Sequence, residues 1–150
     1  MKVTYRKAEK KDAGILIDIY NAAFYDDYIK YGECPAYGRT KEKMELSIIN
    51  TPKLIIMVEK IPAGVLSFES LGKGVYSIGC FCIIPEYQGI GIGTQAFQHF
   101  LTCFDWRRIE LITPADKEQN IRFYTQRCGF KIGNTKMDGN VEVVNFYMER

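Results

Sequence analysis

The stretch that decides the fold is CFCIIPEYQGIGIGTQAFQHF, residues 80–100. An apolar, strand-like run ends at Pro85, a turn rich in glycine follows, and a helical pattern begins at once. Glycines let the backbone approach a ligand closely, and the first N–H groups of a helix have no partner inside the helix. A strand, a glycine turn and a helix in this order therefore predict a cradle for a phosphate or pyrophosphate.

Two other phosphate-binding motifs fit this turn poorly. A P-loop needs a Lys followed by Ser or Thr after its last glycine, whereas this chain has Gly93-Thr94-Gln95. A dinucleotide fingerprint needs G-x-G-x-x-G early in a βαβ unit, but these glycines alternate at 89, 91 and 93, and half of the chain precedes them. The P-loop is therefore excluded and a nicotinamide site is not expected. A glycine turn that merely joins two elements is the simpler alternative.

The turn does match the acyl-CoA signature Gln/Arg-x-x-Gly-x-Gly/Ala, here Gln88-Gly89-Ile90-Gly91-Ile92-Gly93. With its preceding strand, its Pro85-Glu86-Tyr87 lead-in and its following helix, the stretch resembles the GNAT superfamily of acetyl-CoA-dependent N-acetyltransferases. The resemblance extends over the whole length. It implies an α+β fold with a mixed, mostly antiparallel central sheet flanked by about four helices, in the order β-α-α-β-β-β-α-β-α-β-β.

Composition bounds the class of protein. A chain of 150 residues with 47% hydrophobic residues, ten Tyr and nine Phe predicts one globular domain over residues 1–150. The net charge of +2 gives no support to a nucleic-acid partner. The five cysteines, an odd number at scattered positions, favour reduced thiols. Cys80 and Cys82 fall on one face of a strand without further ligands nearby, so we interpret them as core residues and expect no metal.

No membrane span or signal peptide is apparent in the sequence, so a cytoplasmic protein is expected. The order of strands and helices follows from hydrophobic periodicity and turn signals. The predicted turns are 61–64 and 71–74. The predicted strands are Val3–Ala8, Leu54–Glu59, Val65–Glu69, Val75–Ile84, Arg107–Thr113 and two within Lys131–Met148 around Asp138-Gly139. The predicted helices run from an Asp12 cap to Ala23, from a Thr40 cap to Asn50, over Gly91–Phe104, and over Lys117–Cys128 with Gly129 as C-terminal cap.

The resemblance also implies where acetyl-CoA, the expected co-substrate, would bind. The pantetheine arm would pair with the main chain of Phe81, Cys82 and Ile83, as an added strand does. The pyrophosphate would rest on the N–H groups from Gly89 to Thr94, with Gln88 leading into the turn. A backbone N–H of the same strand is the expected donor to the oxyanion.

The segment NIRFYTQRCGF, residues 120–130, resembles the second signature of the family, in which a Tyr precedes a Gly-Phe pair. Tyr124 takes that place and is the candidate general acid for the departing thiolate, since a phenol with a pKa of ~10 is protonated at neutral pH. The alternative is that Tyr124 only packs. Where family members commonly carry an Asn that helps to hold the cofactor, this chain has Lys117, which would contact the pantetheine or a phosphate, or face water.

The general base and the acceptor are not specified by the sequence. The predicted strand Val75–Ile84 carries no acid, and Glu69 and Glu110 are candidates for the general base by residue type only. Residues 24–37 mix aromatic rings with Asp26, Asp27 and Glu33, which describes either an acidic, aromatic mouth for a cationic amine or a solvated loop. The acceptor would be a small-molecule or peptide amine, and a homodimer is possible. The alternative to an enzyme is a CoA-binding module without catalysis.

Overall fold

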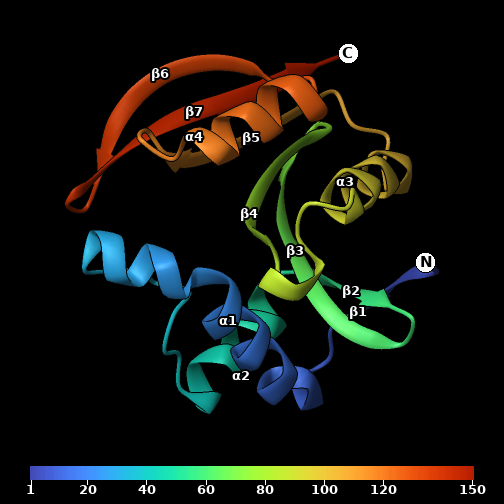
Figure 1. The fold of residues 1–150 in the computed structure, drawn as a ribbon. Coiled ribbons are helices and arrows are strands. Elements are labelled where there is room, and N and C mark those ends of the chain that lie inside the picture. Colours follow the sequence, from blue (N-terminus) through green and yellow to red (C-terminus); the bar gives the residue numbers. More distant parts are fainter. The chain divides into compact units, whose positions relative to one another are not determined.

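A computed structural model describes all 150 residues, and it shows the predicted α+β fold (Figure 1). Its elements follow in the predicted order, with short 3-10 or π turns before α1, before α3 and after α4. The strands are β1 (Val3–Lys7), β2 (Lys53–Val58), β3 (Ile61–Gly72), β4 (Val75–Ile83), β5 (Arg108–Pro114), β6 (Lys131–Asp138) and β7 (Val141–Glu149). The helices are α1 (Ala13–Tyr31), α2 (Lys41–Asn50), α3 (Ile92–Cys103) and α4 (Glu118–Arg122), and the turns are η1 (Lys10–Asp12), η2 (Pro85–Tyr87) and η3 (Phe123–Arg127).

The strands form one mixed sheet. Its order is β1-β2-β3-β4-β5-β7-β6, so the last two strands exchange places relative to the chain. The pairs β1–β2, β2–β3, β5–β7 and β6–β7 are antiparallel, and β4–β5 is parallel. The predicted mixed, mostly antiparallel sheet with four helices is therefore confirmed.

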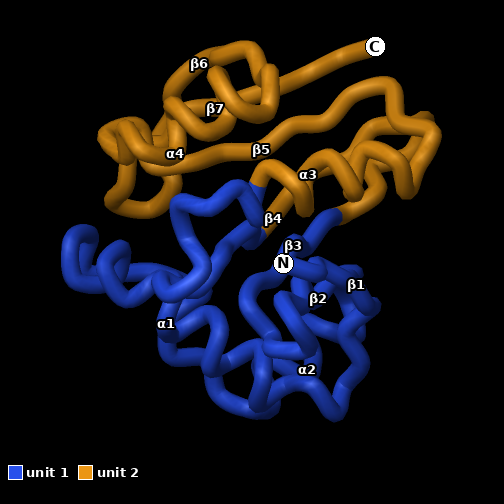
Figure 2. Tube along the Cα trace, turned by 45° about the vertical axis from the view of Figure 1, so that its right-hand side comes forward, with its two compact units in different colours: residues 1–68, 80–93 blue, residues 69–79, 94–150 orange.

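The chain divides into two compact units, which Figure 2 colours separately. Unit 1 comprises residues 1–68 and 80–93, and unit 2 comprises residues 69–79 and 94–150. The division cuts across β3, β4 and the start of α3, so each of these elements contributes residues to both units. A single domain over residues 1–150 stays a prediction.

Unit 1 is built on an aliphatic core between α1, α2 and the strands β2 to β4. Leu16 and Tyr20 of α1 and Met44 of α2 are fully buried in it. Cys82 lies in the same core and Cys80 packs against it, which confirms that this pair is structural. Burial of apolar side chains at about 25 cal/mol per Å² is the main force that holds the two helices on the strands.

Unit 2 has an aromatic core. Phe97 and Phe100 of α3 are buried, and the ring of Phe97 lies 5.3 Å from that of Phe130. Phe146 of β7 is also fully buried. Contacts between aromatic rings at these distances add to the stabilisation that comes from buried area.

The first helix is longer than predicted. The segment from Phe24 was expected to leave the helix, but α1 continues to Tyr31. It ends at Gly32, which adopts the left-handed conformation (φ 74°) that a helix C-terminus favours. No glycine or proline lies between Phe24 and Tyr31, so nothing in the backbone stops the helix there. The residues predicted to form a loop before Gly32 are therefore one exposed end of a helix.

The turn predicted at residues 61–64 is wrong, because β3 already begins at Ile61. The chain reverses instead at Glu59 and Lys60, which have positive φ values of 48° and 71°. Gly64 has a different reason to be glycine: a Cβ there would collide with the carbonyl oxygen of Cys82 on β4. This glycine marks close contact between two strands, which is a recognised use of glycine inside a sheet.

Helix termini were predicted with mixed success. Thr40 caps α2 as expected, since its hydroxyl accepts a 3.2 Å hydrogen bond from the Lys43 N–H. Asp12 precedes α1 but does not cap it. Its carboxylate accepts a bond from the Glu9 N–H and a bidentate pair from Arg6. The last predicted helix is split: α4 ends at Arg122 and the wider π turn η3 follows.

Candidate functional site

The strand β4 leads to the glycine turn, and its pairing changes along its length. Parallel pairing with β5 covers only residues 75–77 of β4 and 108–110 of β5. Farther on, the N–H groups of Cys80 and Ile84 donate to Ser67 Oγ and to the Ala63 carbonyl, both on β3. Because strand residues alternate, the backbone groups of Phe81 and Ile83 point to the opposite edge. The register of β4 with β5 ends at Ser77.

The glycine turn is tied to β4 by a side chain. After the 3-10 turn η2, the Gln88 side-chain amide donates a 2.7 Å hydrogen bond to the Ile83 carbonyl. The Gln88 N–H donates to the Pro85 carbonyl at 3.2 Å. Gln88 therefore holds the lead-in and the end of the strand together, which gives this signature residue a structural role.

Two of the three glycines are required by the backbone itself. Gly89 and Gly91 have φ values of 78° and 87°, where a residue with a side chain is strained. A Cβ on either would meet no atom within 4 Å, so the space beside the turn is open. Gly93 is not among the glycines with positive φ, and it already lies within α3. Glycines 89 and 91 therefore shape the turn, and the turn leaves room beside its backbone.

The start of α3 supplies main-chain donors. The first four N–H groups of a helix have no acceptor within that helix, and here they belong to residues 92–95. Gln88, Gly89 and Gly91 are exposed and Ile90 is 53% exposed, whereas Ile92 is buried at 3%. Ile92 therefore anchors the helix in the core by its side chain. The turn and the helix start present a polar backbone surface of the kind that stabilises anions.

Tyr124 lies in unit 2, within the π turn η3. It is 6% exposed, and its ring packs against Phe130 and Phe146 at centroid distances of 5.8 and 5.7 Å. The Cys128 N–H donates to the Phe123 carbonyl, five residues back, which is the bond that widens the helix into a π turn. Such single π turns often occur at functional sites. The ring contacts fix the phenol and agree with a packing role as well as with a catalytic one.

Lys117 lies at the N-terminal end of α4 and is half-buried. Its carbonyl accepts bonds from the N–H groups of Asn120 and Ile121, and its side chain does not cap the helix. Asn120 has a structural bond of its own, because its amide donates to Thr113 Oγ1 on β5 at 2.9 Å. Asn120 therefore braces α4 against the sheet.

The structure gives little support to the two carboxylates that are candidate general bases by residue type alone. Glu69 is exposed. Glu110 pairs with Arg108 at 3.2 Å, so its charge is already balanced by a neighbour. Of the predicted site residues, those from Phe81 to Gly93 lie together in unit 1, whereas Thr94, Lys117 and Tyr124 belong to unit 2.

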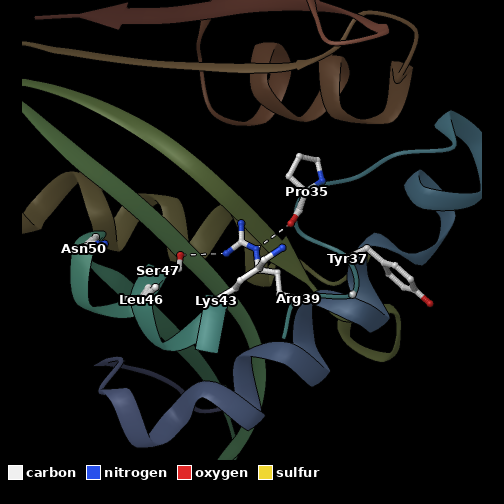
Figure 3. Close-up of a pocket in the computed structure, with 8 residues that line it drawn as sticks. Pro35, Tyr37, Arg39, Lys43, Leu46, Ser47 and Asn50 are labelled. Atoms are coloured by element: carbon white, nitrogen blue, oxygen red, sulfur yellow. Dashed lines mark hydrogen bonds between the residues drawn. The ribbon is translucent and has the colours of Figure 1, made fainter. Parts of the chain in front are cut away.

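An open pocket of about 440 Å³ lies in unit 1, between α2 and the segment that precedes it (Figure 3). Asp26, Asp27 and Glu33 are not among its lining residues, so it is not the acidic mouth considered above. The lining residues are Pro35, Tyr37, Gly38, Arg39, Lys43, Leu46, Ser47 and Asn50.

Sequence reasoning missed a buried polar group below this pocket. The Tyr20 hydroxyl is buried without a hydrogen-bond partner, and the Arg39 guanidinium lies 5.3 Å from the Tyr20 ring centre. Burial, followed by the nearby Cys80 and Cys82, raises the pKa of Tyr20. Lys53, only 3% exposed, has its pKa lowered by burial. These residues come from distant parts of the sequence, so no local pattern could have shown them together.

No three His, Cys, Asp or Glu side chains gather where they could hold a metal ion. None of the helices has both the length and the apolar character that crossing a membrane requires.

A mixed sheet whose central strand runs through a glycine turn into a helix defines an acetyltransferase-like domain. The model of the Acetyltransferase (GNAT) family matches residues 16–130, and the chain therefore belongs to this family. The predicted family is thus confirmed, and the predicted enzyme class with it at the level of the family.

Solved structures agree with this assignment. The crystal structure of an acetyltransferase from Thermus thermophilus matches over 100% of this chain and 98% of its own, at a TM-score of 0.81 and 17% identity. Spermidine N-acetyltransferase from Vibrio cholerae, solved with CoA and spermine, has a TM-score of 0.74 at 18% identity over 98% of this chain and 95% of its own. At such identities the likeness shows the fold.

A curated relative matches a shorter segment. The uncharacterized protein YrkN of Bacillus subtilis (strain 168) is 37% identical over 57 residues. The match covers 37% of this chain and 31% of that protein. The aligned part therefore spans about a third of the length of this relative.

Proposed function

We propose that the protein transfers an acetyl group from acetyl-CoA to a primary amine, by direct attack of the amine within a ternary complex. The observation that carries this proposal is the glycine turn at Gly89 and Gly91, which is open on one side and continues into the unpaired N–H groups of α3. A diphosphate is the kind of group that such a backbone surface binds. The solved relative with CoA and spermine supports the choice of both substrates.

The donor would be held mainly by main-chain groups. The amides of the pantetheine arm would pair with the edge of β4 at Phe81 and Ile83, beside Cys82, where pairing with β5 has already ended. The pyrophosphate would lie on the N–H groups from Gly89 to Thr94, while Gln88 keeps the turn in place. Lys117 would add a positive charge near a phosphate or the pantetheine.

The chemistry needs three events. The neutral amine attacks the thioester carbonyl, a backbone N–H of β4 stabilises the resulting oxyanion, and the C–S bond then breaks. One such donor is worth roughly 3 kcal/mol in the transition state. Tyr124 would give its phenol proton to the departing thiolate, and the proton lost by the amine restores the phenol through solvent. The products are the N-acetylated amine and free CoA.

An acceptor screen tests the proposal. The protein is mixed with acetyl-CoA and a panel of primary amines, free thiol is followed, and products are weighed by mass spectrometry. The expected result is thiol release with at least one amine and a product heavier by one acetyl group. If no amine is acetylated, calorimetry with CoA distinguishes two explanations. Binding of CoA without turnover on a broad panel indicates a CoA-binding module. The absence of any binding heat contradicts the proposal.

A further inference from the structure

The pocket in unit 1 has a lining of unusual charge for a protein that would accept amines. Its ionisable lining residues are Arg39, Lys43 and Tyr37, and none of them is an acid. The acidic residues of the neighbouring α2, Glu42 and Glu45, do not line it. A pocket of about 440 Å³ is within the usual range for small ligands.

Arg39 is held in a fixed position that leaves donors available. Its Nε donates to the Pro35 carbonyl at 2.9 Å, and its Nη1 donates to Ser47 Oγ at 3.1 Å, as the dashed lines in Figure 3 show. The same guanidinium lies against the ring of Tyr20. A guanidinium carries five N–H groups, so the Nη2 pair and one Nη1 hydrogen are not used by these bonds.

No carboxylate of the protein neutralises this charge. Neither Arg39 nor Lys43 takes part in an ion pair, in contrast to Arg6 and Arg108, which pair with acids elsewhere in the chain. A preorganised guanidinium beside a lysine, in a pocket without acids, matches the geometry and charge of an oxyanion.

The pocket is connected to β4 through Tyr20. The ring of Tyr20 lies under Arg39, and Tyr20 belongs to the same buried core as Cys82, against which Cys80 packs. Cys80 and Cys82 flank Phe81, at the strand where the thioester would lie under the function proposed above. The pocket and this part of β4 are therefore joined through one buried tyrosine ring.

We propose that the pocket binds the anionic group of the acceptor, and that the acceptor is a small amine that also carries a carboxylate or a phosphate, such as an amino acid. This inference rests on the proposed acetyl transfer for the other end of the acceptor. The unsatisfied donors of Arg39 bind the oxyanion, Lys43 adds charge at the rim, and the free amine of the same molecule is the group that is acetylated.

Matched acceptors test the anionic group. Amino acids are compared with their amides and with the corresponding decarboxylated amines, and phosphoethanolamine is compared with ethanolamine. We expect kcat/KM to be at least roughly 10-fold higher for the anionic member of a pair, as a hydrogen-bonded charge contributes. The amino-acid series tests whether the pocket binds a carboxylate, and the phosphoethanolamine pair tests whether it binds a phosphate. Equal or better turnover of the neutral members in every pair would overturn the inference and leave acetyl transfer itself intact.

Variants identify the residues. Arg39→Gln is expected to lower kcat/KM for the anionic acceptor by roughly 10- to 100-fold, chiefly through KM, and to leave the KM for acetyl-CoA unchanged. Lys43→Gln on the exposed face of α2 is expected to lower it by a few-fold. Lys41→Gln is the matched control, because it removes the same charge from the same helix at a position that does not line the pocket. Equal effects of the two lysine variants would contradict the proposal.

A binding measurement separates this inference from the proposed function. N-acetylated amino acids and their amides are titrated into the protein and followed by calorimetry, which needs no turnover. Binding of an acetylated acid that is lost in Arg39→Gln supports the anion site even if no amine is acetylated. If turnover occurs but acids and amides bind alike, the anion site is refuted and the acetyltransferase stands.

Discussion

Gln88 and Ile83 are joined by a 2.7 Å hydrogen bond from the Gln88 side-chain amide to the Ile83 carbonyl. The bond closes the segment between β4 and the glycine turn. Gln88 itself is exposed, so it contributes little to the core. The glutamine of the acyl-CoA signature therefore acts on the shape of the main chain, and through the main chain it would affect a bound CoA.

Replacement of Gln88 should thus weaken the donor site more than the fold. For Gln88→Ala we expect the dissociation constant for CoA to rise by roughly 5-fold, which corresponds to the ~1 kcal/mol of one hydrogen bond. Calorimetry with CoA measures it. Gln98→Ala, on an exposed position of α3, is the control and should bind CoA as the unchanged protein does.

Gly91→Ala should strain the turn. Its φ of 87° is unfavourable for a residue with a Cβ, at a cost of about 1 kcal/mol, although the Cβ itself would meet no neighbour. We expect a lower midpoint in urea and weaker CoA binding. Gly14→Ala in α1 is the matched control, since it has open space and ordinary helical φ, and it should stabilise the protein slightly. A Gly91→Ala protein as stable as Gly14→Ala would show that the turn tolerates side chains.

Tyr124→Phe removes the proposed acid but keeps the ring that packs on Phe130 and Phe146. We expect kcat to fall by about 100-fold or more, with little change in the KM for acetyl-CoA or in the melting temperature. Tyr147→Phe, another tyrosine of unit 2, should keep its activity. Full activity of Tyr124→Phe would exclude Tyr124 as the general acid and indicate that it only packs.

The Arg6–Asp12 pair predicts how stability depends on pH. The bidentate bond from Arg6 is the largest cause that holds the pKa of Asp12 below its ordinary 3.8, against the opposing effect of burial. Because the folded pKa is the lower one, the pair stabilises the protein above about pH 4 and loses this effect as pH falls through the folded pKa.

Asp12→Asn should therefore lower the free energy of unfolding by about 2 kcal/mol near neutral pH and by less near about pH 3. Urea denaturation at both pH values measures the difference. Asp18→Asn, at an exposed position of α1, should have little effect at either pH. A loss in Asp12→Asn that does not shrink in acid would mean that the ion pair is not its source.

The sequence predicted those parts of the fold that depend on neighbours in the chain. The cap at Thr40, the helix α3 and the hairpin at Asp138-Gly139 all have local signals, and all are confirmed. The turn at Glu59 and Lys60 was missed because neither residue is a usual turn former, while Pro62 and Gly64 imitate a turn inside β3. The sequence does not predict the full length of α1, because the aromatic and acidic residues from Phe24 onward have the composition of a loop.

In the candidate site, too, the features with local sequence signals were predicted and those that depend on packing were not. Apart from Lys117, the proposed donor site is one continuous segment, so its glycines and Gln88 could be named in advance. The basic pocket depends on Arg39, Ser47 and Tyr20, which only the packing of α1 and α2 brings together. Lys53 follows a proline at the start of a strand and carries no sign in the sequence that it is buried.

All residues that line the basic pocket fall between Pro35 and Asn50. The residues that select the acceptor would then lie in one short segment of the chain, separate from the glycine turn that would bind the donor. Transplanting that piece between related enzymes would be expected to carry the preference for one amine over another, while the host continues to use its own thioester.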